Sequence, residues 1–446
     1  MLNPWRPLYY LLGVILFVVG LALSVGLHEF GHLIPGKLYN VKVTQYFIGF
    51  GRTLWSRQKG ETEYGLKAIP LGGYCKLVGM VPPDPDDPET GTDRVRSRNT
   101  GMFAQLVSDA RDAEYEHVDP HDHDRLFYNK PWWQRVIIMG SGVAINLVLA
   151  FVLFAFVFIG FGVPTPTTTV AGVSKCVIAV TETNVDKPPR ACAASDAEAP
   201  AKAAGFRPGD RFVSINGIPI DDWGQAQKQI RANGDGKAVV VVERDGQRVT
   251  LRPTTTVTTQ NIDPNNPGKI TKVGFLGVVP RQVTQRQGVG YVVDTMANGT
   301  WQTVRTIAAM PVKVYHVARA SVGLEERDPN GPMSVVGAGR VAGEVASQDK
   351  TPVLDRFLSV ILLLAGLNLV LGLINLVPLP PFDGGGIATT LYETVRRAFA
   401  RMRGKPDPGG VDSAKLLPLT YAMAMVILVV SVILIFADIV APVSLT

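Results

Sequence analysis

The stretch that decides the fold is VILFVVGLALSVGLHEFGHLI, residues 14–34, an apolar run that ends in three ionisable side chains. The run is long enough to cross a bilayer as a helix, which takes about 20 apolar residues. His28, Glu29 and His32 would be costly facing lipid, so they must face a protein interior or a water-filled cavity. We therefore expect residues 1–34 to form a transmembrane helix that carries a functional site.

The composition of the whole chain is that of a membrane protein. Of its 446 residues, 46% are hydrophobic and only 18% are charged, which is too apolar for an ordinary soluble protein. The apolar residues are concentrated in four nearly uncharged stretches, at about 10–34, 136–163, 357–377 and 416–440. The sequence therefore predicts a polytopic α-helical protein, with transmembrane helices at 1–34, 131–163, 354–386 and 414–442.

Charge predicts the sidedness of these helices. The connection at 387–413 holds five basic residues, Arg396, Arg397, Arg401, Arg403 and Lys405. Positively charged loops stay in the cytoplasm, so this loop and residues 35–130 are expected there, and residues 164–353 outside. A specific anionic partner for the basic loop is the alternative. The net charge of +6, without basic clusters interleaved with aromatics, argues against nucleic acid. We expect a multi-pass protein of the plasma (inner) membrane.

The two expected cytoplasmic segments before the second helix differ. Residues 35–80 contain β-rich runs separated by glycines, which predict a small sheet of hairpins. Residues 81–130 are acidic and polar, which predicts a flexible insert with a short helix near 102–113. The insert holds His117, His121 and His123, which could bind a metal or simply titrate in a solvated loop.

The long outside segment is expected to hold a β-rich domain at 169–285, followed by short helices within 286–353. Residues 203–220 are expected to form a turn, a strand, an Asn-Gly turn and a second strand. Residues 222–232 are expected to form a helix, and residues 238–253 a hairpin that turns at Asp245-Gly246. Of three cysteines, Cys176 and Cys192 lie in this segment and Cys75 lies in the cytoplasmic loop. This fits one disulfide outside and one thiol inside, with two free thiols as the alternative.

The motif LHEFGH, residues 27–32, points to zinc chemistry. On a helix, positions i and i+4 lie on one face, so His28 and His32 can hold one Zn²⁺ per chain. Glu29 lies beside the first ligand and can act as a general base for peptide hydrolysis. The alternative is a chance match that packs as a polar pair of helices.

A zinc site with two histidines needs a third protein ligand, and the segment NLVPLPPFDGGG, residues 375–386, supplies a candidate. Asp383 is the only acidic residue between Asp355 and Glu393. Prolines break the helix here, which is tolerated at membrane depth only where the backbone lines a cavity. By the charge rule, His28 and Asp383 both lie near the cytoplasmic ends of their helices, although about 350 residues separate them. A simple cytoplasmic turn is the alternative.

The HExxH motif in the first span and NxxPxPxxDG after a later one resemble the site-2 protease family of intramembrane zinc metalloproteases. The likeness covers nearly the whole chain and is to the bacterial branch with a PDZ domain, the regulators of sigma-factor proteolysis. The outside cysteine pair and the acidic insert resemble actinobacterial members. The resemblance implies that His28, His32 and Asp383 bind zinc, with Glu29 as catalytic base.

The same resemblance implies residues that hold the substrate. Asn375 matches the family asparagine, with Pro378 and Pro380 in the same motif. Gly142 and Asn146 look like a GxxxN element, although the proline usual in that element is Ser141 here. The segments 49–51 and 69–74, which include Gly72, resemble a membrane-associated β-hairpin that could pair with an unwound substrate. Residues 203–217 match the PDZ pattern of bacterial proteases, with a generic β-rich binding module as the alternative.

These features together predict an intramembrane metalloendopeptidase. It would cut single-span membrane proteins such as anti-sigma factors, after a first cut outside, and release a cytoplasmic fragment. The expected partners are those substrates, peptide tails at the PDZ domain and the lipid bilayer. A non-catalytic membrane scaffold that presents a PDZ domain is the rival, and it predicts no zinc. A transporter is a second rival, but the sequence shows no internal repeat.

Overall fold

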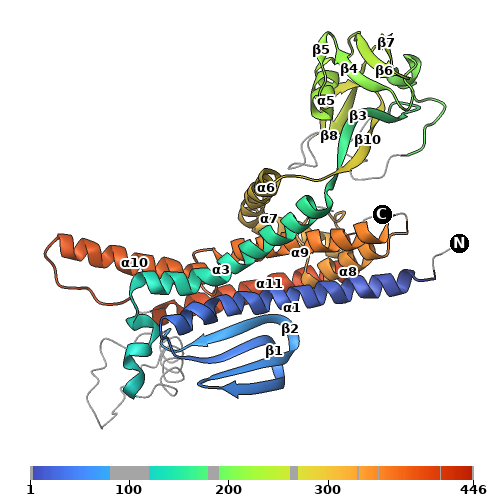
Figure 1. Cartoon of the computed structure of the whole chain (residues 1–446). Coiled ribbons are helices and arrows are strands. Elements are labelled where there is room, and N and C mark those ends of the chain that lie inside the picture. Colours follow the sequence, from blue (N-terminus) through green and yellow to red (C-terminus); the bar gives the residue numbers. More distant parts are fainter. Residues whose placement is uncertain are drawn as a thin grey trace. The chain divides into compact units, whose positions relative to one another are not determined.

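The computed structural model describes residues 4–80, 120–178, 190–261, 270–328, 331–349, 351–411 and 413–443 (Figure 1). The chain divides into two compact units. Unit 1 joins Met1–Val157 to Gly290–Thr446, and unit 2 is Phe158–Val289. The expected insert helix near 102–113 and His117 lie outside the described residues.

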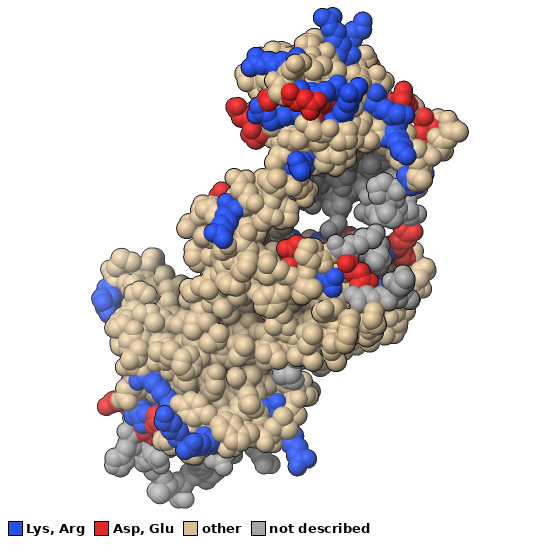
Figure 2. All heavy atoms as spheres, turned by 45° about the vertical axis from the view of Figure 1, so that its right-hand side comes forward, with Lys and Arg blue, Asp and Glu red and all other residues tan. Residues whose placement is uncertain are grey.

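Among the described residues, four helices are long and apolar enough to cross a membrane, as expected from the sequence. They are α1 (Arg6–Leu38), α3 (Trp132–Ala155) with the π-helical turn η3 (Phe156–Phe161), α9 (Val353–Asn375) and α11 (Leu417–Val440). Figure 2 shows a broad part of the surface of unit 1 that bears no Lys, Arg, Asp or Glu. The chain is therefore a multi-pass membrane protein.

The centre of unit 1 is formed by α1, α3 and α9, which pack against one another. A shorter helix, α8 (Val335–Ala346), packs against α1 and α9. Phe17 of α1 and Val360 of α9 are each 1% exposed in this shared core. Small residues bring α1 and α8 close together, because a Cβ on Gly13 would lie 2.6 Å from the Ala342 carbonyl oxygen.

Three helices occupy the described part of the segment in which the sequence predicted short ones. They are α6 (Val289–Ala308), α7 (Met310–Ser321) and α8, and α6 is longer than expected. The far end of α11 packs against α7 through Val317, Leu434 and Ala437. Asp438 of α11 accepts hydrogen bonds from Arg327 at 2.9 Å and from the Ser334 backbone N–H, at the start of α8, at 2.6 Å.

The hairpin sheet of unit 1 consists of β1 (Val43–Lys59) and β2 (Thr62–Leu77), which pair antiparallel. Both strands bend, so that Tyr46 lies beside Cys75 on one side and Tyr64 on the other. The end of the insert contacts this sheet as the turns η1 (Pro120–Arg125) and η2 (Phe127–Asn129). Lys42 pairs with Asp122 at 2.6 Å, so this part of the segment that we predicted to be flexible is docked.

The third span breaks where the prolines predicted it to break. α9 ends at Asn375, and α10 (Asp383–Met402) begins after a connection of seven residues, 376–382. The expected loop at 387–413 is therefore helical as far as Met402, and η4 (Ser413–Leu416) leads into α11. Glycines and β-branched threonines at the start of α10 disfavour a helix in isolation, but α10 packs against α3.

Unit 2 is an antiparallel sheet with helices. The sheet order is β10-β3-β4-β6-β7, with β5 beside β4 and a separate β8–β9 hairpin. The bounds are β3 (Val163–Val173), α4 (Pro200–Ala203), β4 (Arg211–Ile215), β5 (Ile218–Pro219), α5 (Trp223–Ala232), β6 (Val240–Arg244), β7 (Gln247–Leu251), β8 (Thr256–Asn261), β9 (Ile270–Phe275) and β10 (Val278–Gln285). The predicted helix α5 is confirmed, and so are the turns at Asn216-Gly217 and Asp245-Gly246. All four residues of these two turns have positive φ.

Candidate metal centre

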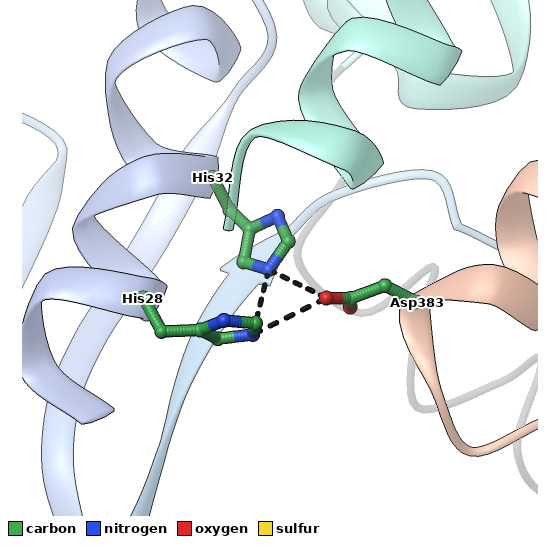
Figure 3. Close-up of side chains that lie close together, drawn as sticks. All are labelled: His28, His32 and Asp383. Carbon is green, nitrogen blue, oxygen red and sulfur yellow. Dashed lines mark hydrogen bonds and ion pairs between the residues drawn. The ribbon is translucent and has the colours of Figure 1, made fainter. Parts of the chain in front are cut away.

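Two histidines and an aspartate from distant parts of the chain converge in unit 1. α1 places His28 and His32 one turn apart on one face, where both are buried. Asp383 comes from the first turn of α10, and its side chain is 14% exposed (Figure 3). One ligand atom of each lies within 4.8 Å of the others, and these three form the one such cluster of His, Cys, Asp and Glu among the described residues.

The distances within the cluster are those of a tetrahedral zinc site. His28 Nε2 lies 3.3 Å from His32 Nε2, and Asp383 Oδ2 lies 3.2 Å and 3.3 Å from these two atoms. Zinc bonds of about 2.0 Å in tetrahedral geometry separate ligand atoms by about 3.3 Å. A donor set of two imidazoles and one carboxylate is typical of a catalytic zinc site, whereas a closed structural site has four protein ligands.

Asp383 reaches the cluster because the break after α9 is tightly folded. A Cβ on Gly384 would lie 2.4 Å from the Leu376 carbonyl oxygen. A Cβ on Gly385 would lie 2.6 Å from the Pro380 nitrogen. The glycines at these two positions therefore let α10 start directly against the end of α9. A carboxylate in the first turn of a helix is also favoured by the helix dipole.

α3 covers the histidines from the other side. His32 Nδ1 lies 2.8 Å from the Ile138 carbonyl oxygen, to which it can donate. That hydrogen bond leaves His32 Nε2 unprotonated and directed toward Asp383. A Cβ on Gly142 would lie 2.4 Å from His32 Nε2, so only glycine lets α3 approach the rings this closely.

Glu29 of α1 points toward the hairpin sheet. Its carboxylate lies near the Cys75 backbone of β2. A Cβ on Gly73 would lie 3.0 Å from Glu29 Cγ. The glutamate therefore follows the first histidine of the cluster and packs against the sheet at Gly73.

The structure brings together some of the other predicted residues but not all. Asn146 lies behind His28, with its Nδ2 3.2 Å from His28 Nδ1. Asn375 is the last residue of α9, and within the described part of the chain no hydrogen bond joins it to the cluster. Pro378 is exposed and Pro380 partly exposed in the break, while Gly72 precedes the Gly73 that faces Glu29.

The predicted cysteine pair belongs to unit 2, and His123 of the histidine-rich segment is not a member of the cluster. Cys176 and Cys192 form a disulfide in unit 2, and Cys75 is free. His123 Nδ1 lies 3.3 Å from the amide nitrogen of Asn129. The side chain of His121 is outside the described residues.

Two contributors to the site are not evident from the sequence. The Ile138 carbonyl is a backbone group, so no residue type marks it. Ser141 Oγ donates to the Gly31 carbonyl at 2.7 Å and joins α1 to α3 beside His32. The small residues at 140–142 were a signal of close helix packing, but they did not indicate the partner helix.

Comparison with known proteins finds metalloproteases. The profile of peptidase family M50 matches residues 16–406. The zinc metalloprotease Rip1 of Mycobacterium tuberculosis is 32% identical over 448 residues, which cover 98% of this chain and 99% of the relative. Rip1 of Mycolicibacterium smegmatis is 31% identical over 451 residues, with 97% and 98% covered. The metalloprotease MmpA of Caulobacter vibrioides is 28% identical over 399 residues, 86% of each chain.

Proposed function

Because the chain belongs to peptidase family M50, the site-2 family of membrane zinc proteases, we propose that His28, His32 and Asp383 are its zinc ligands and Glu29 its general base. The chain is a zinc metalloprotease with four helices able to span a membrane. The observation that carries the ligand assignment is the set of three distances of 3.2–3.3 Å between His28 Nε2, His32 Nε2 and Asp383 Oδ2.

The chemistry follows from this arrangement. When bound, zinc supplies a Lewis acid that polarises the scissile carbonyl and makes water a stronger acid. Glu29 takes the proton from the attacking water and passes it to the leaving amine, since a carboxylate next to the first ligand can serve both steps. Peptide hydrolysis needs no other cofactor in this scheme.

The substrate is a single-span membrane protein whose helix unwinds beside the cluster. Pro378 and Pro380 lie in the break between α9 and α10, where the backbone is not helical and can contact an extended chain, and Asn375 ends α9 directly before this break. The hairpin sheet, which includes Gly72, offers strands to which such a chain can add. We assign Asn146 to His28 rather than to the substrate, because it is 1% exposed.

Sidedness and the role of unit 2 complete the proposal. The basic residues in the last turns of α10 and directly after it support a position of the metal centre near the cytoplasmic side, with unit 2 outside. Unit 2 is a PDZ domain that binds the new tail left by a first outside cut. A pocket between α5 and residues 274–278, lined by Trp223, Ile230 and Leu276, supports peptide binding there. The second cut then releases a cytoplasmic fragment, as expected for an anti-sigma factor.

The decisive experiment compares two substitutions in the purified full chain. Glu29→Gln should retain about one zinc per chain yet lose cleavage of a model single-span substrate by at least about 100-fold. His28→Ala should lose both zinc and cleavage. Normal cleavage by Glu29→Gln would refute the base assignment. Unchanged zinc content in His28→Ala and in Asp383→Ala would refute the ligand assignment.

A further inference from the structure

Asn146 of α3 is buried against a proposed zinc ligand. It is 1% exposed, and its Nδ2 lies 3.2 Å from His28 Nδ1. Its Oδ1 is also buried and has no hydrogen-bond partner among the described residues. A side chain enclosed in this way touches the ring of His28 and has no surface left for a peptide.

The chemistry of His28 determines what it needs from this neighbour. A neutral imidazole that binds a metal through Nε2 carries its proton on Nδ1, and that N–H needs an acceptor. The amide NH₂ of Asn146 cannot accept, but its oxygen can. The two ends of an amide have nearly the same shape, so a half-turn of the side chain exchanges them in place.

We propose that Asn146 is the positioning residue of His28: its Oδ1 accepts the Nδ1–H and fixes the tautomer that leaves Nε2 for zinc. This role rests on the ligand assignment proposed above. It also gives the buried oxygen the partner that it lacks.

The second histidine supports the same reading. His32 Nδ1 lies 2.8 Å from the Ile138 carbonyl oxygen, which is an acceptor only. Ile138 and Asn146 both belong to α3, about two turns apart. One helix thus provides an acceptor behind each histidine of α1 and sets the orientation of both rings.

The test measures zinc affinity in the purified full chain, by competition with a coloured zinc chelator. Asn146→Leu removes the acceptor at similar volume and should weaken zinc binding about 10- to 100-fold. Asn146→Asp keeps the shape and the acceptor and should bind zinc at least as tightly as the wild type. With Co²⁺ in place of zinc, the visible spectrum should change in Asn146→Leu but not in Asn146→Asp.

Asn368→Leu is the matched control. Asn368 is another fully buried amide between helices, and its Nδ2 donates to Ser24 Oγ at 2.9 Å and to the Leu364 carbonyl at 2.8 Å. It does not hydrogen-bond a histidine of the cluster. Its replacement should lower stability and leave zinc affinity unchanged, which separates positioning from packing.

Two results would overturn the role of Asn146. One is wild-type zinc affinity in Asn146→Leu. The other is zinc binding that is weaker by about 10-fold or more in Asn146→Asp than in the wild type. This second result decides the question even if Asn146→Leu does not fold. A wild type that binds no zinc would instead refute the metal site, and the role of Asn146 with it.

Discussion

Gly142 determines how closely α3 approaches the two histidine rings of α1. We predict that Gly142→Ala weakens zinc binding and cleavage, because its Cβ would lie 2.4 Å from His32 Nε2 and 3.0 Å from His28 Cε1. Overpacking of this kind costs about 1–3 kcal/mol, or roughly 10- to 100-fold in affinity. Zinc titration of the purified variant measures the effect.

Gly140→Ala is the control for this prediction. Gly140 lies on the same helix as Gly142, but a Cβ at position 140 would meet only Ile387 Cδ1, at 3.9 Å. Alanine is also a better helix former than glycine, so this variant should bind zinc normally and be no less stable. Equal zinc affinity in the two alanine variants would show that the close approach at Gly142 is unimportant.

Asp210 illustrates a residue that acts through charge in unit 2. Burial raises the pKa of its carboxyl, but hydrogen bonds from Arg244 and from the Arg207 backbone N–H outweigh burial, so the pKa is lowered. A carboxyl whose pKa is lower in the folded than in the unfolded state stabilises the fold at pH values above its unfolded-state pKa of about 3.9. This stabilisation is lost as the pH falls through the folded-state pKa.

We therefore predict that Asp210→Asn destabilises unit 2 by about 2 kcal/mol at pH 7 and by progressively less below about pH 4. Hydrogen exchange of the β4 and β6 amides in the full chain measures this difference. Asp245→Asn, in the exposed hairpin turn, should follow the wild type at every pH. A constant difference between Asp210→Asn and wild type down to pH 2 would contradict the charge argument.

At the residue scale, the sequence identified side chains but not their partners. The spacing of His28 and His32 predicted that they share a helix face, because helical periodicity is local. Asp383 followed from its isolation among apolar residues. The contact between Asn146 and His28 could not follow from spacing, since it depends on how α3 crosses α1.

Among the elements, α3 and α10 are joined by a buried ion pair. Arg135 of α3 donates to Glu393 of α10 at 2.9 Å and 3.2 Å, and their side chains are 9% and 5% exposed. The pair fixes the helix that carries Asp383 against the helix that covers the histidines. We predict that Glu393→Gln costs about 3 kcal/mol, because it leaves the Arg135 charge buried without its counter-ion.

Unfolding in detergent micelles measures this cost. The comparison is Asp407→Asn, which removes the charge from an exposed pair with Arg397 at 3.4 Å. Exposed pairs contribute up to about 1 kcal/mol, so this variant should remain close to the wild type. A similar small loss in Glu393→Gln would mean that the buried pair does not hold α10.

At the element scale, the sequence predicted long apolar helices and tight turns well. Both are encoded locally, by twenty apolar residues in one case and by Asn-Gly or Asp-Gly in the other. It did not predict that α10 continues the chain as a helix after Asp383. Three glycines begin that helix, and its support comes from α3, about 250 residues away in the sequence.

On the scale of the whole molecule, the division into two units separates the disulfide from the metal centre. Cys176 and Cys192 lie in unit 2, whereas all three proposed zinc ligands lie in unit 1. The two cysteines are 16 positions apart, and a disulfide that closes a loop of this length contributes about 3 kcal/mol to the free energy of unfolding. We predict that Cys176→Ser with Cys192→Ser speeds hydrogen exchange throughout unit 2 and leaves zinc affinity unchanged. Loss of zinc in this variant would show that the two units are coupled.

The charge rule also makes a whole-molecule prediction, because it assigns the hairpin sheet and unit 2 to opposite sides of the membrane. Lys59 in β1 and Arg248 in β7 are both exposed, so each can be replaced by cysteine without disturbing a core. The background chain has Cys176 and Cys192 replaced by serine. It keeps Cys75, whose pKa burial raises to about 12, so that this thiol reacts slowly. A membrane-impermeant maleimide on intact cells should label Arg248→Cys, whereas Lys59→Cys should be labelled only after permeabilisation. Labelling of Lys59→Cys in intact cells would show that the hairpin sheet lies outside, contrary to the charge rule. Cleavage would then release its product outside the cell.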